Sequence, residues 1–122
     1  MRPGAPVADV PLQHAGRSTW LLRQSGGDFV LLVFGPTLPP TLTGLQPSLK
    51  VLLIVPQDQA LPPAAALHDR LGIFASRFDA QPGSAWLLRP DQHVCARWRS
   101  ATLVDVSRAM DRALAKEPAC SP

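Results

Sequence analysis

The chain has 122 residues, enough to bury one hydrophobic core and too few for two separate domains. Its 46% apolar and 17% charged residues are typical of a folded globular domain and exclude an intrinsically disordered chain. The net charge of +3 comes mainly from arginines scattered along the sequence, and because they form no continuous basic run we expect no nucleic-acid partner.

The sequence gives no sign of export or membrane insertion. Pro3 and Pro6 interrupt the first residues, which therefore lack the apolar segment of a secretory signal. No stretch approaches the roughly 20 apolar residues that a membrane span requires. Two cysteines, Cys95 and Cys120, are too few and too far apart to suggest a disulfide framework. We therefore expect a cytoplasmic protein with no membrane partner.

The N-terminal part is rich in proline and glycine. Residues 1–16 are expected to form an extended arm or linker. Residues 20–22 are compatible with a short strand or with a single helical turn, and residues 25–27 end either one.

Two apolar runs, residues 28–35 and 49–56, carry the strongest strand signal. Each is apolar on both faces, as a parallel strand covered on both sides requires. About a dozen residues join them, so they predict a right-handed crossover unit. Any helix in the connection should be short and begin at Pro39 or Pro40.

A helix is predicted over residues 64–71. The pair Pro62-Pro63 would open it, and Gly72 would end it in a left-handed conformation.

Residues 84–99 predict a β-hairpin. An apolar run reaches the turn signal Pro90-Asp91, and a second run with strict alternation follows it. Strict alternation places three residues of the second run on one face and three on the other: Val94, Ala96 and Trp98 against Cys95, Arg97 and Arg99.

The last predicted element is a helix over residues 102–116. Apolar residues recur on one side at helical spacing, and either Ser100 or Thr102 can cap the start, Thr102 together with Asp105 as a capping box. Residues 118–122 contain two prolines and are expected to form a disordered tail.

In chain order these elements predict an α/β fold with a mixed sheet of about four to five strands. A parallel crossover pair is joined to a C-terminal antiparallel hairpin, and helices flank the sheet. This is the order of the thioredoxin-like core, and we expect that domain over residues 17–117.

A thioredoxin-like fold raises the question of dithiol chemistry. That chemistry uses a thiolate at a helix N-terminus directly after the first long strand. Residues 34–40 read FGPTLPP and contain no cysteine, so the fold is expected to be redox-inactive. Cys95 lies in the middle of a predicted strand, where a cysteine acts as a small hydrophobic side chain.

Other chemistries lack their residue patterns too. His14, His68 and His93 are far apart and have no ligand spacing, so no metal site is predicted. No G-x-S-x-G, G-x-G-x-x-G or P-loop occurs, so we identify no catalytic and no cofactor-binding residue. Asp91 lies in a turn, where an aspartate usually bonds its own backbone.

The two tryptophans of the hairpin are either cross-strand neighbours or lie on different faces, depending on the register. We interpret both tryptophans first as core residues and second as anchors of an interface near the sheet edge. The candidate interface residues are Trp86, Trp98, Arg97 and Arg99.

Residues 87–98, LLRPDQHVCARW, resemble the LVRPDGHVAWR segment near the C-terminus of flavin-dependent aromatic hydroxylases. These are FAD monooxygenases of the phenol hydroxylase and 3-(3-hydroxyphenyl)propionate hydroxylase type. Residues 3–9 and 26–32 are similar to two further segments of that family, PG-x-R-A-P and G-x-x-F-V-L-L. Gln92 stands where the family usually has glycine, in a turn position that strains other residues.

The resemblance implies that the chain is the non-catalytic C-terminal thioredoxin-like domain of such a hydroxylase. FAD and NAD(P)H would then belong to the parent protein, and neither would bind to this chain. The expected partners are the upstream FAD and substrate domains and a second copy in a homodimer. The alternative is a free-standing, redox-inactive thioredoxin-like module for binding or dimerisation.

Overall fold

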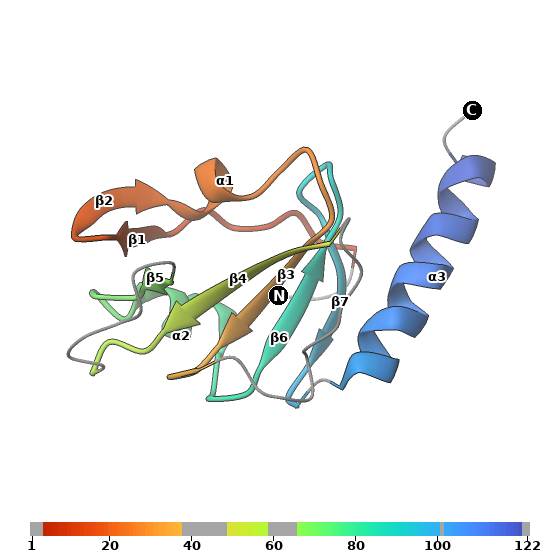
Figure 1. Ribbon diagram of the computed structural model, residues 1–122. Coiled ribbons are helices and arrows are strands. Elements are labelled where there is room, and N and C mark those ends of the chain that lie inside the picture. Colours follow the sequence, from red (N-terminus) through yellow and green to blue (C-terminus); the bar gives the residue numbers. More distant parts are fainter. Residues whose placement is uncertain (1–3, 38–48, 59–65, 101, 121–122) are drawn as a thin grey trace.

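The structure is a computed structural model that describes residues 4–37, 49–58, 66–100 and 102–120 (Figure 1). Within these residues, seven strands form one mixed sheet in the order β2-β1-β5-β4-β3-β6-β7. The strands are β1 (Pro11–His14), β2 (Arg17–Trp20), β3 (Val30–Phe34), β4 (Lys50–Val55), β5 (Leu67–His68), β6 (Ala85–Leu88) and β7 (Val94–Trp98). The helices are α1 (Leu21–Gln24), α2 (Ile73–Phe78) and α3 (Leu103–Cys120).

The predicted pair of parallel strands is confirmed at the centre of the sheet. β3 is buried along its whole length and pairs in parallel with β4, from Val30 opposite Lys50 to Phe34 opposite Ile54. A strand buried on both faces gains little from alternation, which explains its continuous apolar sequence. The predicted helix at Pro39 or Pro40 lies outside the described residues.

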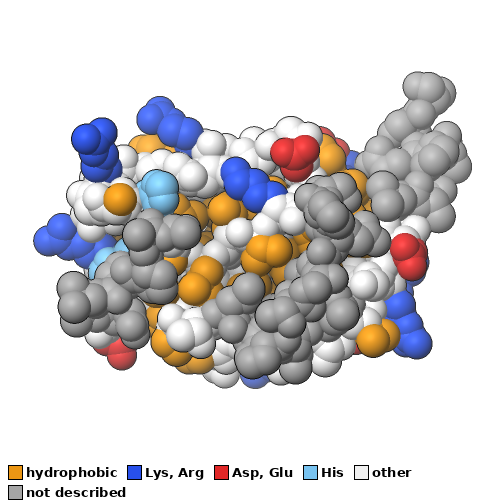
Figure 2. All heavy atoms as spheres, in the orientation of Figure 1, with side chains coloured by type: hydrophobic (Ala, Val, Ile, Leu, Met, Phe, Trp, Pro, Cys, Tyr) orange, Lys and Arg blue, Asp and Glu red, His pale blue; other side chains and the backbone are white. Residues whose placement is uncertain are grey.

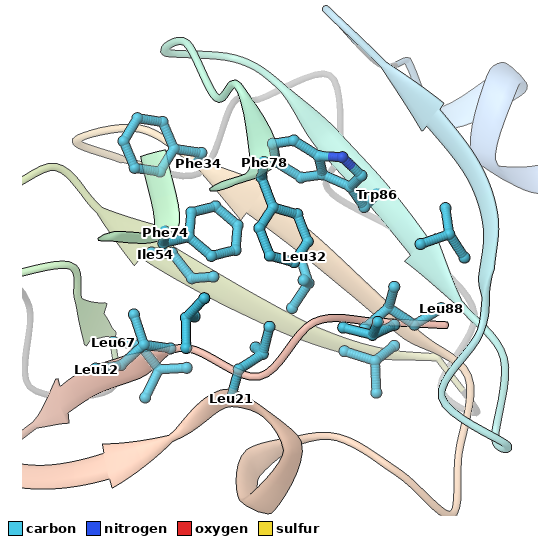
Figure 3. Close-up of a cluster of buried hydrophobic side chains, with 14 residues drawn as sticks. Leu12, Leu21, Leu32, Phe34, Ile54, Leu67, Phe74, Phe78, Trp86 and Leu88 are labelled. Carbon is cyan, nitrogen blue, oxygen red and sulfur yellow. The ribbon is translucent and has the colours of Figure 1, made fainter. Parts of the chain in front are cut away.

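One face of the sheet carries an aromatic cluster (Figure 3). The rings of Phe74 and Phe78 stack with their centroids 4.3 Å apart, and Phe34 stacks on Phe74 at 5.7 Å. Trp86 meets both α2 rings edge to face, at 5.4 Å and 5.3 Å. Such offset and perpendicular contacts are favourable for aromatic rings, so they fix α2 against β3 and β6.

On the opposite face, α3 packs at the end of the sheet that carries β7 (Figure 1). Val106, Ala109 and Met110 are buried there with Leu31 and Leu87 of the sheet. The predicted capping box is confirmed: Asp105 N donates to Thr102 Oγ1 at 3.2 Å, and Thr102 N donates to Asp105 Oδ2 at 3.1 Å.

The predicted hairpin is confirmed, with one correction to its faces. The register runs from Trp86 opposite Arg97 and Leu87 opposite Ala96 to Leu88 opposite Val94, so Cys95 is an extra residue that forms a β-bulge. Val94 therefore joins the aromatic face, while Cys95, Ala96 and Trp98 pack on the α3 face. The prediction of strict alternation along this strand was wrong, because the extra residue of the bulge shifts the residues before and after it to different faces.

The turn of the hairpin has the predicted strain. Gln92 has φ 63°, in the left-handed region, and its N–H donates to the Arg89 carbonyl at 2.9 Å. The N-terminal segment holds this turn in place, because Val7 N donates to the Gln92 carbonyl and Val94 N donates to the Ala5 carbonyl.

The predicted helix over residues 64–71 is wrong where the structure describes it. Leu67 and His68 form β5, which pairs with β4 on one side and β1 on the other. The Asp69 carboxylate then accepts the backbone N–H groups of Phe74 and Ala75, both at 2.9 Å, and α2 begins after Gly72. Pairing with two neighbouring strands outweighs the local helix propensity.

Three further expectations change. The sheet has seven strands instead of four to five, because β1, β2 and β5 join it. β1 lies inside residues 1–16, which were expected to form an arm outside the domain. α3 continues to Cys120 through Pro118, at which the tail was expected to begin, because a proline in the last turn removes only one helical hydrogen bond.

Candidate functional site

The end of β3 is where a dithiol site would lie in this fold, and its backbone is tied on both sides. Gly83 N donates to the Phe34 carbonyl at 2.8 Å, Phe34 N donates to the Ser84 carbonyl at 2.9 Å, and Gly35 N donates to the Ile54 carbonyl at 3.0 Å. The sequence from residue 35 to residue 48 contains no cysteine. The backbone at this position is held in place by hydrogen bonds, but the sequence that follows lacks the cysteine that dithiol exchange needs as its nucleophile.

Cys95 does not replace that nucleophile. It lies at the bulge of β7, is half-buried and packs against the cluster under α3. A strand interior provides no helix dipole to stabilise a thiolate. Its placement agrees with the predicted role as a small hydrophobic side chain.

The described residues contain no group of three His, Cys, Asp or Glu side chains that could hold a metal ion. Over the same ranges, no helix combines the length and apolar character needed to cross a bilayer.

Charged side chains gather at the turn of the hairpin. Arg89 donates to the Asp91 carboxylate from Nε at 3.1 Å and also from Nη2, and His93 Nδ1 lies 3.3 Å from Asp91 Oδ1. The hydrogen bond from Arg89 is the main reason that the pKa of Asp91 lies below its ordinary value of 3.8. Asp91 and Arg89 are 48% and 40% exposed, so the pair is a surface ion pair that fastens the turn, and we assign it no acid–base role.

The four candidate interface residues lie on both faces of the hairpin and differ in burial. Trp86 is completely buried in the aromatic cluster and offers no surface to a partner. Trp98 lies on the other face, opposite Ala85, and is half-buried against the α3 cluster. Arg97 is half-buried on the face of Trp86, and Arg99 is exposed just beyond β7.

An apolar feature that was not predicted from the sequence lies at the other edge of the sheet. Trp20 of β2 and Leu71 of the β5–α2 connection are 47% and 62% exposed. Together with Arg70 and residues of β1 and β2 they line a hollow of about 390 Å³. Its signal in the sequence is a tryptophan at the end of the polar strand Arg17–Trp20, and neither this strand nor its pairing with β1 was predicted.

Comparisons with known proteins identify the fold. No protein-family model matches the chain, and no curated protein matches it significantly. Among solved structures, the flavin-dependent monooxygenase PieE, in complex with FAD and substrate, is 25% identical. The match covers 89% of this chain and 20% of PieE with a TM-score of 0.66, so this chain spans about a fifth of that protein's length.

Two other similar structures have no flavin in their names. A thioredoxin-like protein from Bacteroides caccae is 20% identical over 90% of this chain and 50% of its own, with a TM-score of 0.64. A PrxQ mutant from Xylella fastidiosa is 16% identical over 96% of this chain and 98% of its own, with a TM-score of 0.63. These likenesses, together with the mixed sheet and its flanking helices, confirm that the chain has the thioredoxin-like fold.

Proposed function

We propose that this chain is the non-catalytic C-terminal domain of an FAD-dependent aromatic-ring monooxygenase. The observation that carries the proposal is the structural match to PieE, in which 89% of this chain aligns with 20% of a flavin-dependent monooxygenase. The resemblance of residues 87–98 to the hydroxylase segment LVRPDGHVAWR supports it independently.

In this role the domain packs against other parts of its parent and contributes to subunit association. FAD and NAD(P)H would bind upstream of Met1, and no residue of this chain would touch the reacting atoms. β7 is an edge strand of the sheet, and the proposed contact residues lie at its C-terminal end: Arg97, Trp98 and Arg99. Trp86 is left out of this set because it is enclosed in the core.

The experiment is to detect the native gene product with an antibody raised against this chain, and to measure its mass and its released flavin. We expect a polypeptide several times longer than 122 residues that carries FAD. Its upstream sequence should contain a G-x-G-x-x-G fingerprint in a strand–turn–helix unit. A product of this chain's own size, without flavin, would reject the proposal.

A second candidate is a free-standing, redox-inactive binding or dimerisation module. It is favoured by the PrxQ structure, because the match spans 98% of that protein and this fold can therefore make up a whole protein. The same mass measurement decides between the two candidates, and a sedimentation experiment on the purified chain tests dimerisation.

A further inference from the structure

The exposed Trp20 results from the geometry of the β1–β2 hairpin. Leu12 lies opposite Thr19, and both side chains are buried on the core side. Because side chains alternate along a strand, Pro11 and Trp20, which also lie opposite each other, point to the other face. Trp20 is therefore held by its register on the outside of the sheet.

Trp20 lines two hollows in the surface, of which the second is the more open. The first, of about 390 Å³, is lined by β1, β2, Arg70 and Leu71. The second, of about 430 Å³, is lined by Asp9, Trp20, Leu22 and Arg23. A large exposed apolar side chain that lines hollows in the surface is the kind of anchor on which peptide side chains dock.

The strand that carries Trp20 is the outermost strand of the sheet on this side, next to β1 alone (Figure 1). An edge strand presents backbone N–H and C=O groups along its outer side. Extended peptides bind to such edges by adding a strand, with the backbone supplying affinity and side-chain pockets supplying specificity.

The charge of this surface selects the partner. Arg70 lines the first hollow and Arg23 the second, Arg17 begins the same strand, and all three are exposed. Figure 2 shows Lys and Arg side chains gathered at the end of the molecule that carries β1 and β2. Among the described residues that line the two hollows, Asp9 alone carries a carboxylate, and it already accepts the Leu22 N–H at 3.0 Å. A second copy of this chain would bring arginines against arginines, which disfavours a symmetric contact.

We propose that β2 binds an extended acidic segment of a partner protein. The segment adds a strand to the edge of β2, places an apolar side chain in the hollow between Trp20 and Leu71, and sets its carboxylates against Arg17, Arg23 and Arg70. This proposal does not depend on the monooxygenase assignment, because it rests on the β1–β2 hairpin, Arg23 and the β5–α2 connection.

The probe is a short blocked peptide in which glutamate and valine alternate around one central phenylalanine. Binding to the full chain is measured by fluorescence anisotropy, and the contact is mapped by amide NMR. We expect shifts confined to β2, Arg23 and residues 70–71. Loss of an aromatic or apolar anchor usually costs more than 1 kcal/mol, so W20S and L71S should each weaken binding on the order of tenfold.

The matched controls lie on α3, at the other end of the molecule (Figure 1). V104S removes an exposed apolar side chain, and R108E reverses an exposed charge, as R70E does in the proposed site. Both should leave binding unchanged, whereas R70E should weaken it several-fold. A peptide with lysine for glutamate, and one with N-methylated backbone, should bind more weakly than the probe.

Three results would overturn the proposal. The first is no measurable binding of the acidic peptide. The second is that the lysine peptide binds as tightly as the acidic probe, or that W20S and L71S bind the probe as tightly as the unmodified chain does. The third is a concentration-dependent dimer of the unliganded chain that L71S abolishes, because the surface would then be a contact between copies.

Discussion

The side-chain amide of Gln92 occupies the space into which a Cβ on Gly26 would point. An added Cβ would lie 2.4 Å from Gln92 Nε2, and Gly26 has φ +102°, which L side chains rarely adopt. The same amide nitrogen reaches the Leu22 carbonyl at 3.5 Å, so the hairpin turn and the loop before β3 meet at these two residues. The neighbouring bond from Gly27 N to the Pro90 carbonyl, 3.2 Å long, strengthens the same junction.

Substituting Gly26 should therefore loosen this junction. We expect G26A to lower the free energy of unfolding by about 2 kcal/mol, because the backbone is strained and Gln92 must move. G27A is the matched control: its φ is +80°, and an added Cβ meets nothing within 4 Å, so its cost should be smaller. Urea denaturation of both variants measures the difference, and equal costs would show that Gln92 plays no part.

Asp69 is a buried carboxylate whose two oxygens accept the N–H groups that begin α2. We expect D69A to destabilise the chain by about 3 kcal/mol, because one buried backbone donor, of Phe74, and one partly buried donor, of Ala75, lose their acceptor. D69N retains one carbonyl oxygen and should lose less. D58A removes an exposed aspartate and serves as the control. Similar stabilities of D69A and D58A would contradict this role.

Trp86 combines a large packing contribution with an unpaired polar atom. Its Nε1 is buried and has no hydrogen-bond partner among the described residues. W86A should cost about 3 to 5 kcal/mol, as deletion of a buried aromatic side chain does. W86F should cost much less, because it removes the unpaired N–H while keeping one ring against Phe74 and Phe78.

Thermal and urea denaturation test this ranking. W98F, on the opposite face and only half-buried, controls for the loss of an indole. If W86F proved as damaging as W86A, the indole N–H would have to make a favourable interaction.

The Asp91 ion pair should make stability depend on pH in acid. Because Arg89 lowers the folded-state pKa of Asp91 below 3.8, the pair contributes above the ordinary carboxyl value and is lost as the pH falls through the folded value. At neutral pH we expect D91N to cost less than about 1 kcal/mol, since the pair is exposed.

The difference between D91N and the unmodified chain should disappear once the pH is below the folded pKa. Denaturation curves recorded from neutral to acidic pH measure it, with D111N, an exposed residue of α3, as the control. A difference that persists in strong acid would show that the carboxylate charge is not its cause.

Local signals in the sequence determined the elements that form from their own residues or from an adjacent partner. The apolar runs of β3 and β4 were recognisable because they are continuous: β3 is buried along its whole length and needs no alternation, and β4, which is buried at Ile54 and Val55, pairs beside it. The Pro90-Asp91 turn located the hairpin, and Thr102 with Asp105 located the start of α3, because both signals act within four residues.

Tertiary structure decided what depends on distant partners. Leu67 and His68 follow three alanines, which favour a helix, yet they form a strand that pairs with β4 and β1. No local pattern in the sequence reveals this pairing. The bulge at Cys95 arises from the register against β6, and it moved Val94 to the other face of the sheet. Trp20 is exposed because Thr19, its neighbour, packs inward opposite Leu12. Chain sequence fixes local conformation through short-range bonds, whereas register and exposure follow from the packing of segments far apart in the chain.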